Sequence, residues 1–197
     1  MRRHVTAGLL VPLICISTVL AASGQTQDFQ KEPRIPTAKQ TSLGMYLTAK
    51  QAHERWQAEP EKTKVLDVRT LEEFIFVGHA EMAWNVPLAV QTNQWDAEKR
   101  HFAMQPDPTF ASRVKAVFAP EDTLLVMCRS GGRSAMAVNL LAEAGFKNVY
   151  NITDGMEGDK VEDPDSVYHG KRMKNGWKNS GLPWTYELDP ERMRLPD

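Results

Sequence analysis

The chain has 197 residues, enough for a single domain with a full hydrophobic core. Its 24 basic and 25 acidic residues give no bulk positive field, so we expect no nucleic-acid binding. The hydrophobic fraction of 42% and the charged fraction of 25% are typical of a globular chain, and two cysteines are too few for a disulfide scaffold or a four-thiolate zinc site. Composition therefore allows a compact globular domain and little more.

Residues 1–22 are predicted to be a secretory signal peptide. Two arginines precede an uncharged, mostly apolar stretch from Val5 to Ala22, and small residues follow it. Cleavage is expected after Ala21 or one or two residues later. An uncleaved anchor is the alternative, but the run contains a proline and a glycine and is short for the ~20 residues of a membrane span. We expect an exported protein, periplasmic if bacterial, with no stable span after cleavage.

Cleavage after Ala21 would change both the charge and the cysteine count. The remaining chain has 22 basic and 25 acidic residues, a formal charge of −3, and it has lost Cys15. Cys128 is then the single cysteine of an exported protein and has no partner for an internal disulfide. Its thiol must be buried and inert, paired with another chain, or used chemically.

The rest of the chain reads as a linker, one α/β domain and a tail. Residues 23–42 are polar and predict a linker, residues 43–157 the domain, and residues 158–197 an extension that packs on it. Strands alternating with helices indicate a mostly parallel sheet, and residues 89–107 are expected to be a loop insertion. The expected helices are 49–58, 110–118 and one that ends at Gly145, and residues 71–76 are expected to be a short helix or a turn. The expected strands are 65–68, 84–88, 124–127 and 148–152.

The loop that follows the apolar strand Leu124–Met127 carries the chemistry. Cys128 stands at the carboxyl end of this strand, where α/β proteins place their ligand sites. Gly131 and Gly132 allow several backbone N–H groups to converge, and the start of the next helix adds partial positive charge. Arg129 and Arg133 add two full charges. The sequence therefore predicts an anion site around a thiol, and positive charge of this kind favours the nucleophilic thiolate.

These motifs resemble the rhodanese (thiosulfate sulfurtransferase) family. The stretch Cys128–Ser134 looks like the active-site loop of that family, and two further blocks occur in the family's order. The departures are an Ala at position 80, the insertion at 89–107 and the added residues 157–180. Of these two blocks, the first comprises residues 65–69, 72–74, 78–80 and 85–87, and the second comprises residues 141–146, 148–149 and 154–156.

The resemblance implies the fold, the reaction and the roles of the loop residues. The fold would be a central, mostly parallel sheet flanked by helices on both faces. Cys128 would take a sulfur from an anionic donor such as thiosulfate, forming a persulfide, and pass it to cyanide or a thiol. No metal or organic cofactor would be needed, since the sulfur stays bound to the protein. The substrate-binding residues would be Arg129, Ser130, Gly131, Gly132, Arg133 and Ser134.

Residues outside the loop are predicted to support it. Asp67 and Arg69 are expected to pair with each other or with Glu73, a structural rather than catalytic role. His79 is a candidate proton donor, although a structural histidine is the stronger interpretation. Three tryptophans, Trp56, Trp84 and Trp95, are expected to pack rather than to bind substrate.

Three other functions are alternatives to sulfur transfer. Cysteine phosphatases have five residues between cysteine and arginine, whereas four separate Cys128 from Arg133, which favours a single sulfur atom over phosphate. Disulfide exchange is disfavoured because no resolving cysteine is present. A sulfur-carrying or docking protein with little turnover stays open, and its partner would be an exported redox or sulfur-metabolism protein.

Overall fold

The structure, a computed structural model, describes residues 34–196. The expected signal peptide, residues 1–22, and the first part of the expected linker lie outside this range. From Ile35 onward the chain forms one compact unit.

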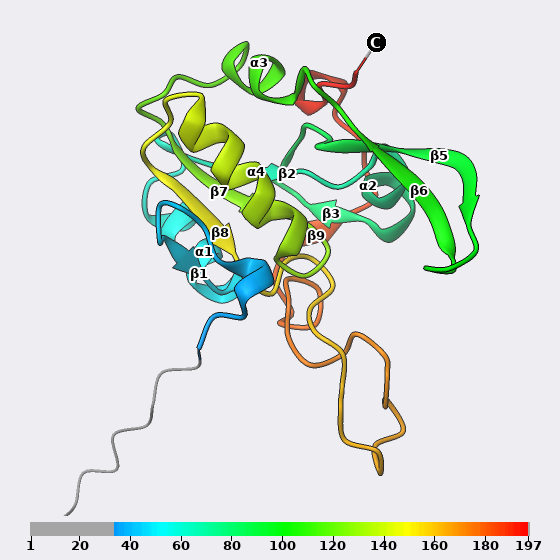
Figure 1. Ribbon diagram of the computed structural model, residues 1–197. Helices are drawn as coiled ribbons and strands as arrows, with labels where there is room; N and C mark the ends of the chain where they lie inside the picture. The colour runs from blue at the N-terminus through cyan, green and yellow to red at the C-terminus, as the bar shows by residue number, and fades with distance from the viewer. Residues whose placement is uncertain (1–33, 197) are drawn as a thin grey trace, which may run out of the picture. The chain divides into compact units, whose positions relative to one another are not determined.

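A five-stranded sheet forms the centre of the unit (Figure 1). Its strand order is β1-β8-β7-β2-β4, and every neighbouring pair is parallel. Parallel neighbours need crossover connections, and helices supply several of them. The strands are β1 (Tyr46–Leu47), β2 (Thr63–Asp67), β4 (Trp84–Asn85), β7 (Thr123–Met127) and β8 (Val149–Ile152).

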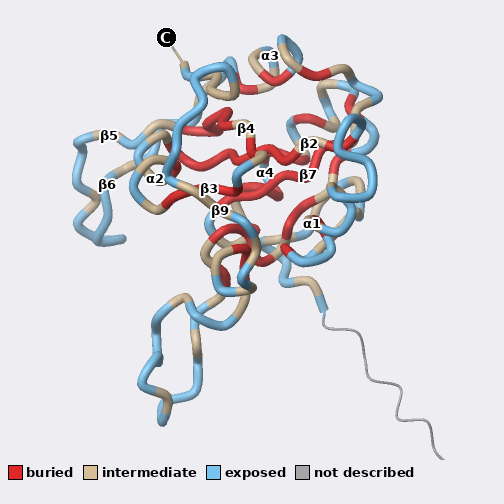
Figure 2. The backbone as a smooth tube through the Cα atoms, turned by 180° about the vertical axis from the view of Figure 1, so that it is seen from behind, coloured by how far each residue is buried: buried red, intermediate tan, exposed pale blue. Residues whose placement is uncertain are grey.

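The two faces of the sheet are buried under different helices. On β7, Leu124 and Val126 point into one apolar cluster, while Leu125 and Met127 point into the other. The first cluster includes residues of α3 (Phe110–Lys115) and α4 (Gly132–Glu143), and the second includes residues of α1 (Ala49–Ala58) and α2 (Leu71–Val77). In Figure 2 the buried residues, drawn in red, lie mostly in the strands at the centre of the unit. The predicted parallel α/β fold with helices on both faces is confirmed.

Local sequence explains where two of these helices begin. Thr48 and Thr70 are N-caps, and each accepts a hydrogen bond from a backbone N–H three residues later. Gln51 and Glu73 return the contact to the N-cap backbone, which completes a capping box at both helices.

The segment 89–107 is a β-hairpin and not the expected loop. Strands β5 (Ala89–Asp96) and β6 (His101–Pro106) pair antiparallel and extend away from the sheet (Figure 1). Most of its side chains are exposed on both faces. Strands that are exposed on both faces need no alternation of apolar and polar residues. The sequence pattern therefore did not predict these two strands.

Residues near both ends of the unit also hold it together. Part of the expected linker is a short 3-10 helix, η1 (Thr37–Lys39), and the Lys39 ammonium pairs with Asp159 at 2.7 Å. In the extension, Trp177 is fully buried in the second cluster and its indole N–H donates to the Pro183 carbonyl at 2.8 Å.

Two further elements lie within the extension. Strand β9 (Trp184–Thr185) pairs with β3 (His79–Ala80), and η2 spans Pro190–Arg192. Among residues 34–196, no helix has both the length and the apolar character that crossing a membrane requires.

Candidate active site

Cys128 lies immediately after β7, with its side chain against the start of α4. The residue is 2% exposed. The Gly131 N–H donates to its Sγ at 3.2 Å, and the Ser134 hydroxyl oxygen lies 3.4 Å from the same sulfur. The short loop thus folds back so that a backbone amide and a hydroxyl both face the sulfur, an arrangement that favours negative charge there.

Two glycines allow this tight loop. Gly131 has a φ of +95°, and a Cβ at this position would lie 2.2 Å from the Thr153 carbonyl oxygen. Gly155 has a φ of +60°, and its Cβ would lie 2.4 Å from the Cys128 carbonyl oxygen. Both positions therefore require glycine for backbone conformation and for space.

The segment after β8 holds the loop from behind. The Met156 N–H donates to the Cys128 carbonyl at 2.8 Å, and the Glu157 N–H donates to the Arg129 carbonyl at 2.9 Å. These bonds fix the backbone on both sides of the Cys128–Arg129 peptide. The main chain of this segment therefore holds the loop in place.

Asn151 is a site residue that the sequence analysis did not identify. It is fully buried on β8, and its amide nitrogen donates to the Gly131 carbonyl at 3.1 Å and the Lys39 carbonyl at 2.9 Å. Its Oδ1 lies 2.7 Å from the Ser134 hydroxyl oxygen. Both amide hydrogens of Asn151 are committed, so its Oδ1 can only accept. The single hydroxyl proton of Ser134 is therefore donated either to Asn151 Oδ1 or to Cys128 Sγ, one at a time. A polar residue inside an apolar strand was the signal available.

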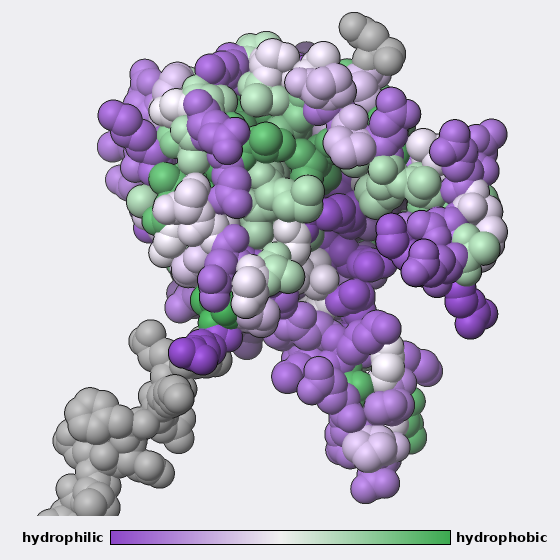
Figure 3. Space-filling view, viewed as in Figure 1, coloured by the Kyte–Doolittle hydropathy of each residue, from purple (hydrophilic) through white to green (hydrophobic). Residues whose placement is uncertain are grey.

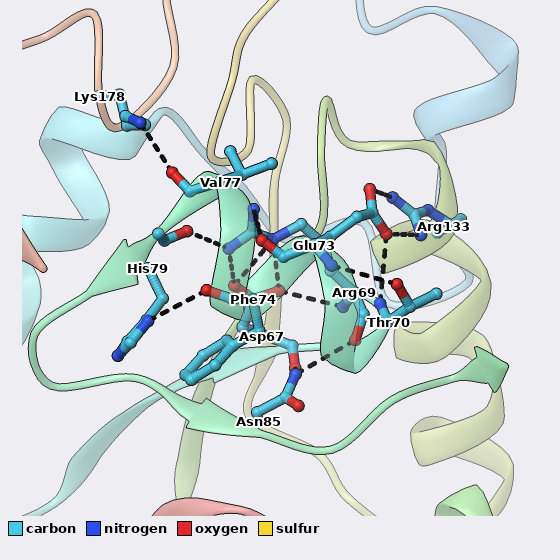
Figure 4. Close-up of polar contacts among 11 residues, drawn as sticks. Asp67, Arg69, Thr70, Glu73, Phe74, Val77, His79, Asn85, Arg133 and Lys178 are labelled. Carbon is cyan, nitrogen blue, oxygen red and sulfur yellow. Dashed lines mark hydrogen bonds and ion pairs between the residues drawn. The ribbon is translucent and has the colours of Figure 1, made fainter. Parts of the chain in front are cut away.

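Arg133 is held by Glu73 and does not extend freely into the site. The two guanidinium nitrogens each donate to one carboxylate oxygen at 2.6 Å, and both side chains are 22% exposed (Figure 4). Burial raises the pKa of Glu73, but the bonds from Arg133 outweigh it and hold that pKa below its ordinary value. Burial likewise opposes the charge on Arg133, while Glu73 and, to a lesser extent, Cys128 raise its pKa. Glu73 was expected as an alternative partner of Asp67 and Arg69, but its carboxylate pairs with Arg133.

The expected pair of Asp67 and Arg69 lies beneath α2. Arg69 Nη2 lies 2.6 Å from Asp67 Oδ2 in a fully buried salt bridge, and it also donates to the Gly78 carbonyl at 2.8 Å. Burial lowers the pKa of Arg69, but the contacts with Asp67 raise it overall. Arg69 also donates to the Glu73 carbonyl at 3.4 Å, so the pair joins the end of β2 to α2 (Figure 4).

His79 packs beside the same helix. Its ring stacks on the Phe74 ring with centroids 3.7 Å apart, and its Nδ1 lies 3.3 Å from the Phe74 carbonyl oxygen. Burial lowers its pKa. Among the hydrogen bonds of residues 34–196, none joins His79 to Cys128. The histidine contacts Phe74 of α2 and pairs with Thr185 of the C-terminal extension.

A cavity of about 510 Å³ opens between the Cys128 loop and the hairpin. Arg129, Arg133 and Glu73 line one side. The other side comes from β5 and β6 and consists of Gln91, Trp95, His101, Phe102 and Met104. The expectation for Trp95 was wrong, because this residue is 57% exposed, whereas Trp56 and Trp84 pack against the two apolar clusters. Among the described residues, no group of three or more His, Cys, Asp or Glu side chains is placed to hold a metal ion.

Fold and loop together define a class: parallel α/β proteins with a cysteine at a strand end, facing the start of a helix. The family model described as the rhodanese-like domain matches residues 48–162, and the chain belongs to this family. A crystal structure of Rv0390 from M. tuberculosis has a TM-score of 0.56 and 27% identity, covering 72% of this chain and 96% of that one.

Sequence similarity to curated relatives covers part of the chain. Thiosulfate sulfurtransferase 16 of Arabidopsis thaliana, a chloroplastic protein, is 39% identical over 92 residues, which cover 47% of this chain and 69% of that protein. The uncharacterized protein RP600 of Rickettsia prowazekii is 38% identical over 66 residues. That match covers 34% of this chain and spans 44% of the rickettsial protein. The family membership supports sulfur transfer as the general activity.

Proposed function

We propose that this protein moves a sulfane sulfur from an anionic donor such as thiosulfate to a thiophilic acceptor such as cyanide or a thiol. The observation that carries the proposal is the environment of Cys128 Sγ, with the Gly131 N–H at 3.2 Å and the Ser134 hydroxyl oxygen at 3.4 Å. Hydrogen-bond donors directed at this sulfur stabilise the Cys128 thiolate before it attacks the donor and again after the acceptor has taken the outer sulfur.

The cycle has two displacement steps. In the first, the Cys128 thiolate attacks the outer sulfur of thiosulfate, the sulfur–sulfur bond of the donor breaks, and sulfite leaves with the bonding electrons. In the second, cyanide attacks the outer sulfur of the persulfide, thiocyanate leaves, and the electrons return to Cys128 as a thiolate. Neither step needs an oxidant or a reductant, so the proposed cofactor requirement is none.

The loop residues have distinct proposed roles in this cycle. The backbone of Ser130, Gly131 and Gly132 surrounds the terminal sulfur, and Ser134 donates to it. Arg129 is exposed and recruits the anionic donor. Arg133 lies beside the pocket with its charge balanced by Glu73, so we propose that it acts through electrostatics at short range.

Intact-mass measurement tests the proposal directly. The protein is incubated with thiosulfate, freed of excess donor and weighed, and cyanide is then added and thiocyanate assayed. We expect one added sulfur, lost on cyanide treatment, and no added sulfur in Cys128→Ser. Loading without thiocyanate formation would favour the sulfur-carrier alternative. Hydrolysis of a phosphate ester without loading would refute sulfur transfer altogether.

We also propose that the protein is exported, with residues 1–22 removed, and that its partner is an exported redox or sulfur-metabolism protein. The support is the order of charge, apolar run and small residues in the sequence. Mass determination of the protein recovered from the periplasm of an expressing bacterium tests cleavage. Recovery of the uncleaved chain in the membrane fraction would contradict it.

A further inference from the structure

The cavity between the hairpin and the loop that carries Arg129 and Arg133 is much larger than the proposed inorganic substrates require. Its volume is about 510 Å³, within the range of ~300–1,000 Å³ that is usual for sites of organic ligands. Thiosulfate has five heavy atoms and cyanide has two. Neither fills the space between the loop and the hairpin.

The hairpin side of the cavity offers apolar surface. Trp95 and Phe102 meet edge to face with ring centroids 5.3 Å apart, and Met104 lies next to them along β6. The three side chains are 57%, 45% and 36% exposed. Pale green apolar atoms interrupt the hydrophilic purple surface over the hairpin in Figure 3. A hydrated inorganic anion gains nothing from such a surface, whereas an apolar organic group does.

The loop side of the cavity offers one uncompensated positive charge. Glu73 and Arg133 neutralise each other through their two hydrogen bonds. Arg129 is exposed, and among the salt bridges of residues 34–196 it has no carboxylate partner. A guanidinium in this state binds a carboxylate through two parallel hydrogen bonds.

We propose that the sulfur acceptor is a small organic thiol with an apolar, preferably aromatic, body and a carboxylate. Trp95, Phe102 and Met104 hold the body, and Arg129 holds the carboxylate. The thiolate attacks the outer sulfur of the Cys128 persulfide, a new sulfur–sulfur bond forms, and the old one breaks with its electrons returning to Cys128. The products are an organic persulfide and the free thiolate. This inference rests on the proposed sulfurtransferase function.

A single-turnover experiment tests the acceptor class. The protein is loaded with thiosulfate and desalted, and the loss of the added sulfur is followed by intact mass with three thiols. These are 4-(mercaptomethyl)benzoate, mercaptoacetate, which lacks the aromatic body, and benzyl mercaptan, which lacks the carboxylate. We expect the first to react at least about tenfold faster than either of the others, a ratio equal to ~1.4 kcal/mol.

Three variants assign this preference to residues. Trp95→Ala is expected to bring the ratio of 4-(mercaptomethyl)benzoate to mercaptoacetate to within about twofold of one. Arg129→Gln is expected to remove the advantage over benzyl mercaptan. Phe76→Ala changes a 78% exposed aromatic residue outside the cavity and is expected to keep both ratios. Ratios are compared within each variant, so a general loss of activity cancels.

The outcomes separate this inference from the proposed function. No added sulfur in the wild-type protein overturns the proposed function and the acceptor assignment together. A persulfide that cyanide removes, but with equal rates for the three thiols, overturns only the acceptor assignment. The acceptor assignment alone is also overturned if the preference for 4-(mercaptomethyl)benzoate survives Trp95→Ala. It is likewise overturned if none of the three thiols removes the sulfur and only a cysteine in a partner protein does.

Discussion

At the scale of single residues, Glu73 controls the position of Arg133 beside the Cys128 loop. The pair joins α2 to the first turn of α4, and its two bonds of 2.6 Å are charge-assisted. Glu73 also completes the capping box of its own helix. One carboxylate thus ties a helix start to the wall of the candidate site.

Glu73→Gln is expected to lower the free energy of unfolding at pH 7 by about 1.5–3 kcal/mol, the typical contribution of hydrogen bonds to charged groups. The pKa of Glu73 is depressed in the folded protein, so its contribution is present above the unfolded pKa of ~4.3 and is lost as the pH falls through the folded pKa. Urea unfolding between pH 7 and pH 3 measures the difference from wild type. It should shrink with acidification.

Glu72→Gln is the matched control, because Glu72 is exposed and also lies in the first turn of α2. Glu72→Gln removes the same negative charge from the first turn of α2 but leaves the Glu73–Arg133 contact intact. An equal effect of the two variants, or a Glu73→Gln effect that grows toward low pH, would contradict the assignment.

At the scale of elements, the junction of β7 and α4 depends on a left-handed glycine. Gly131 is the N-cap of α4, and no side chain caps this helix start. Its own N–H is directed at Cys128 Sγ, and its carbonyl accepts from Asn151. The conformation of this one residue therefore sets the position of the sulfur relative to the helix.

Gly131→Ala is expected to destabilise the protein more than Gly145→Ala does. Both glycines are left-handed, with φ values of +95° and +101°, so each alanine costs about 1–2 kcal/mol from backbone strain. Only at position 131 does the new Cβ meet a neighbour, the Thr153 carbonyl oxygen, which adds about 1–3 kcal/mol. Thermal unfolding and sulfur loading are measured on both variants. Equal destabilisation, or unchanged loading by Gly131→Ala, would show that this close approach is unimportant.

At the scale of the whole molecule, the C-terminal extension contributes Trp177 to the core. Gly176 donates its N–H to Asp154 at 3.1 Å, and the same carboxylate accepts the Ala49 N–H at 2.7 Å. The backbone N–H of Trp177 donates to the Gly155 carbonyl at 2.8 Å, and Gly155 lies directly against the Cys128 loop. The extension therefore supports the segment that holds the loop.

Trp177→Ala is expected to lower the free energy of unfolding by about 3–5 kcal/mol, the usual cost of removing a large buried aromatic side chain. Trp95→Ala removes the same atoms from a 57% exposed position and is expected to cost at most about 0.5 kcal/mol. Urea denaturation of the two variants checks the contrast. A small effect at Trp177 would mean that the extension adds little to the core.

Much of the sheet was predictable from local sequence. The apolar run at 124–127, the capped helix at 49–58 and the glycines after Cys128 place the loop at a strand end, because each signal involves neighbours in the chain. The hairpin at 89–107 was not predicted, since strands exposed on both faces have no alternating pattern.

By itself, the sequence determined the fold class, the family and the cysteine at the centre of the candidate site. Only the tertiary structure decided the partners around it. Glu73 and Arg133 are 60 residues apart, and Asn151 lies 17 residues from Ser134, so no local pattern could pair them. The exposed tryptophan on the hairpin was likewise assigned to a cavity wall only by its place in space. Periodicity and loop motifs report short-range preferences, whereas packing brings distant side chains together.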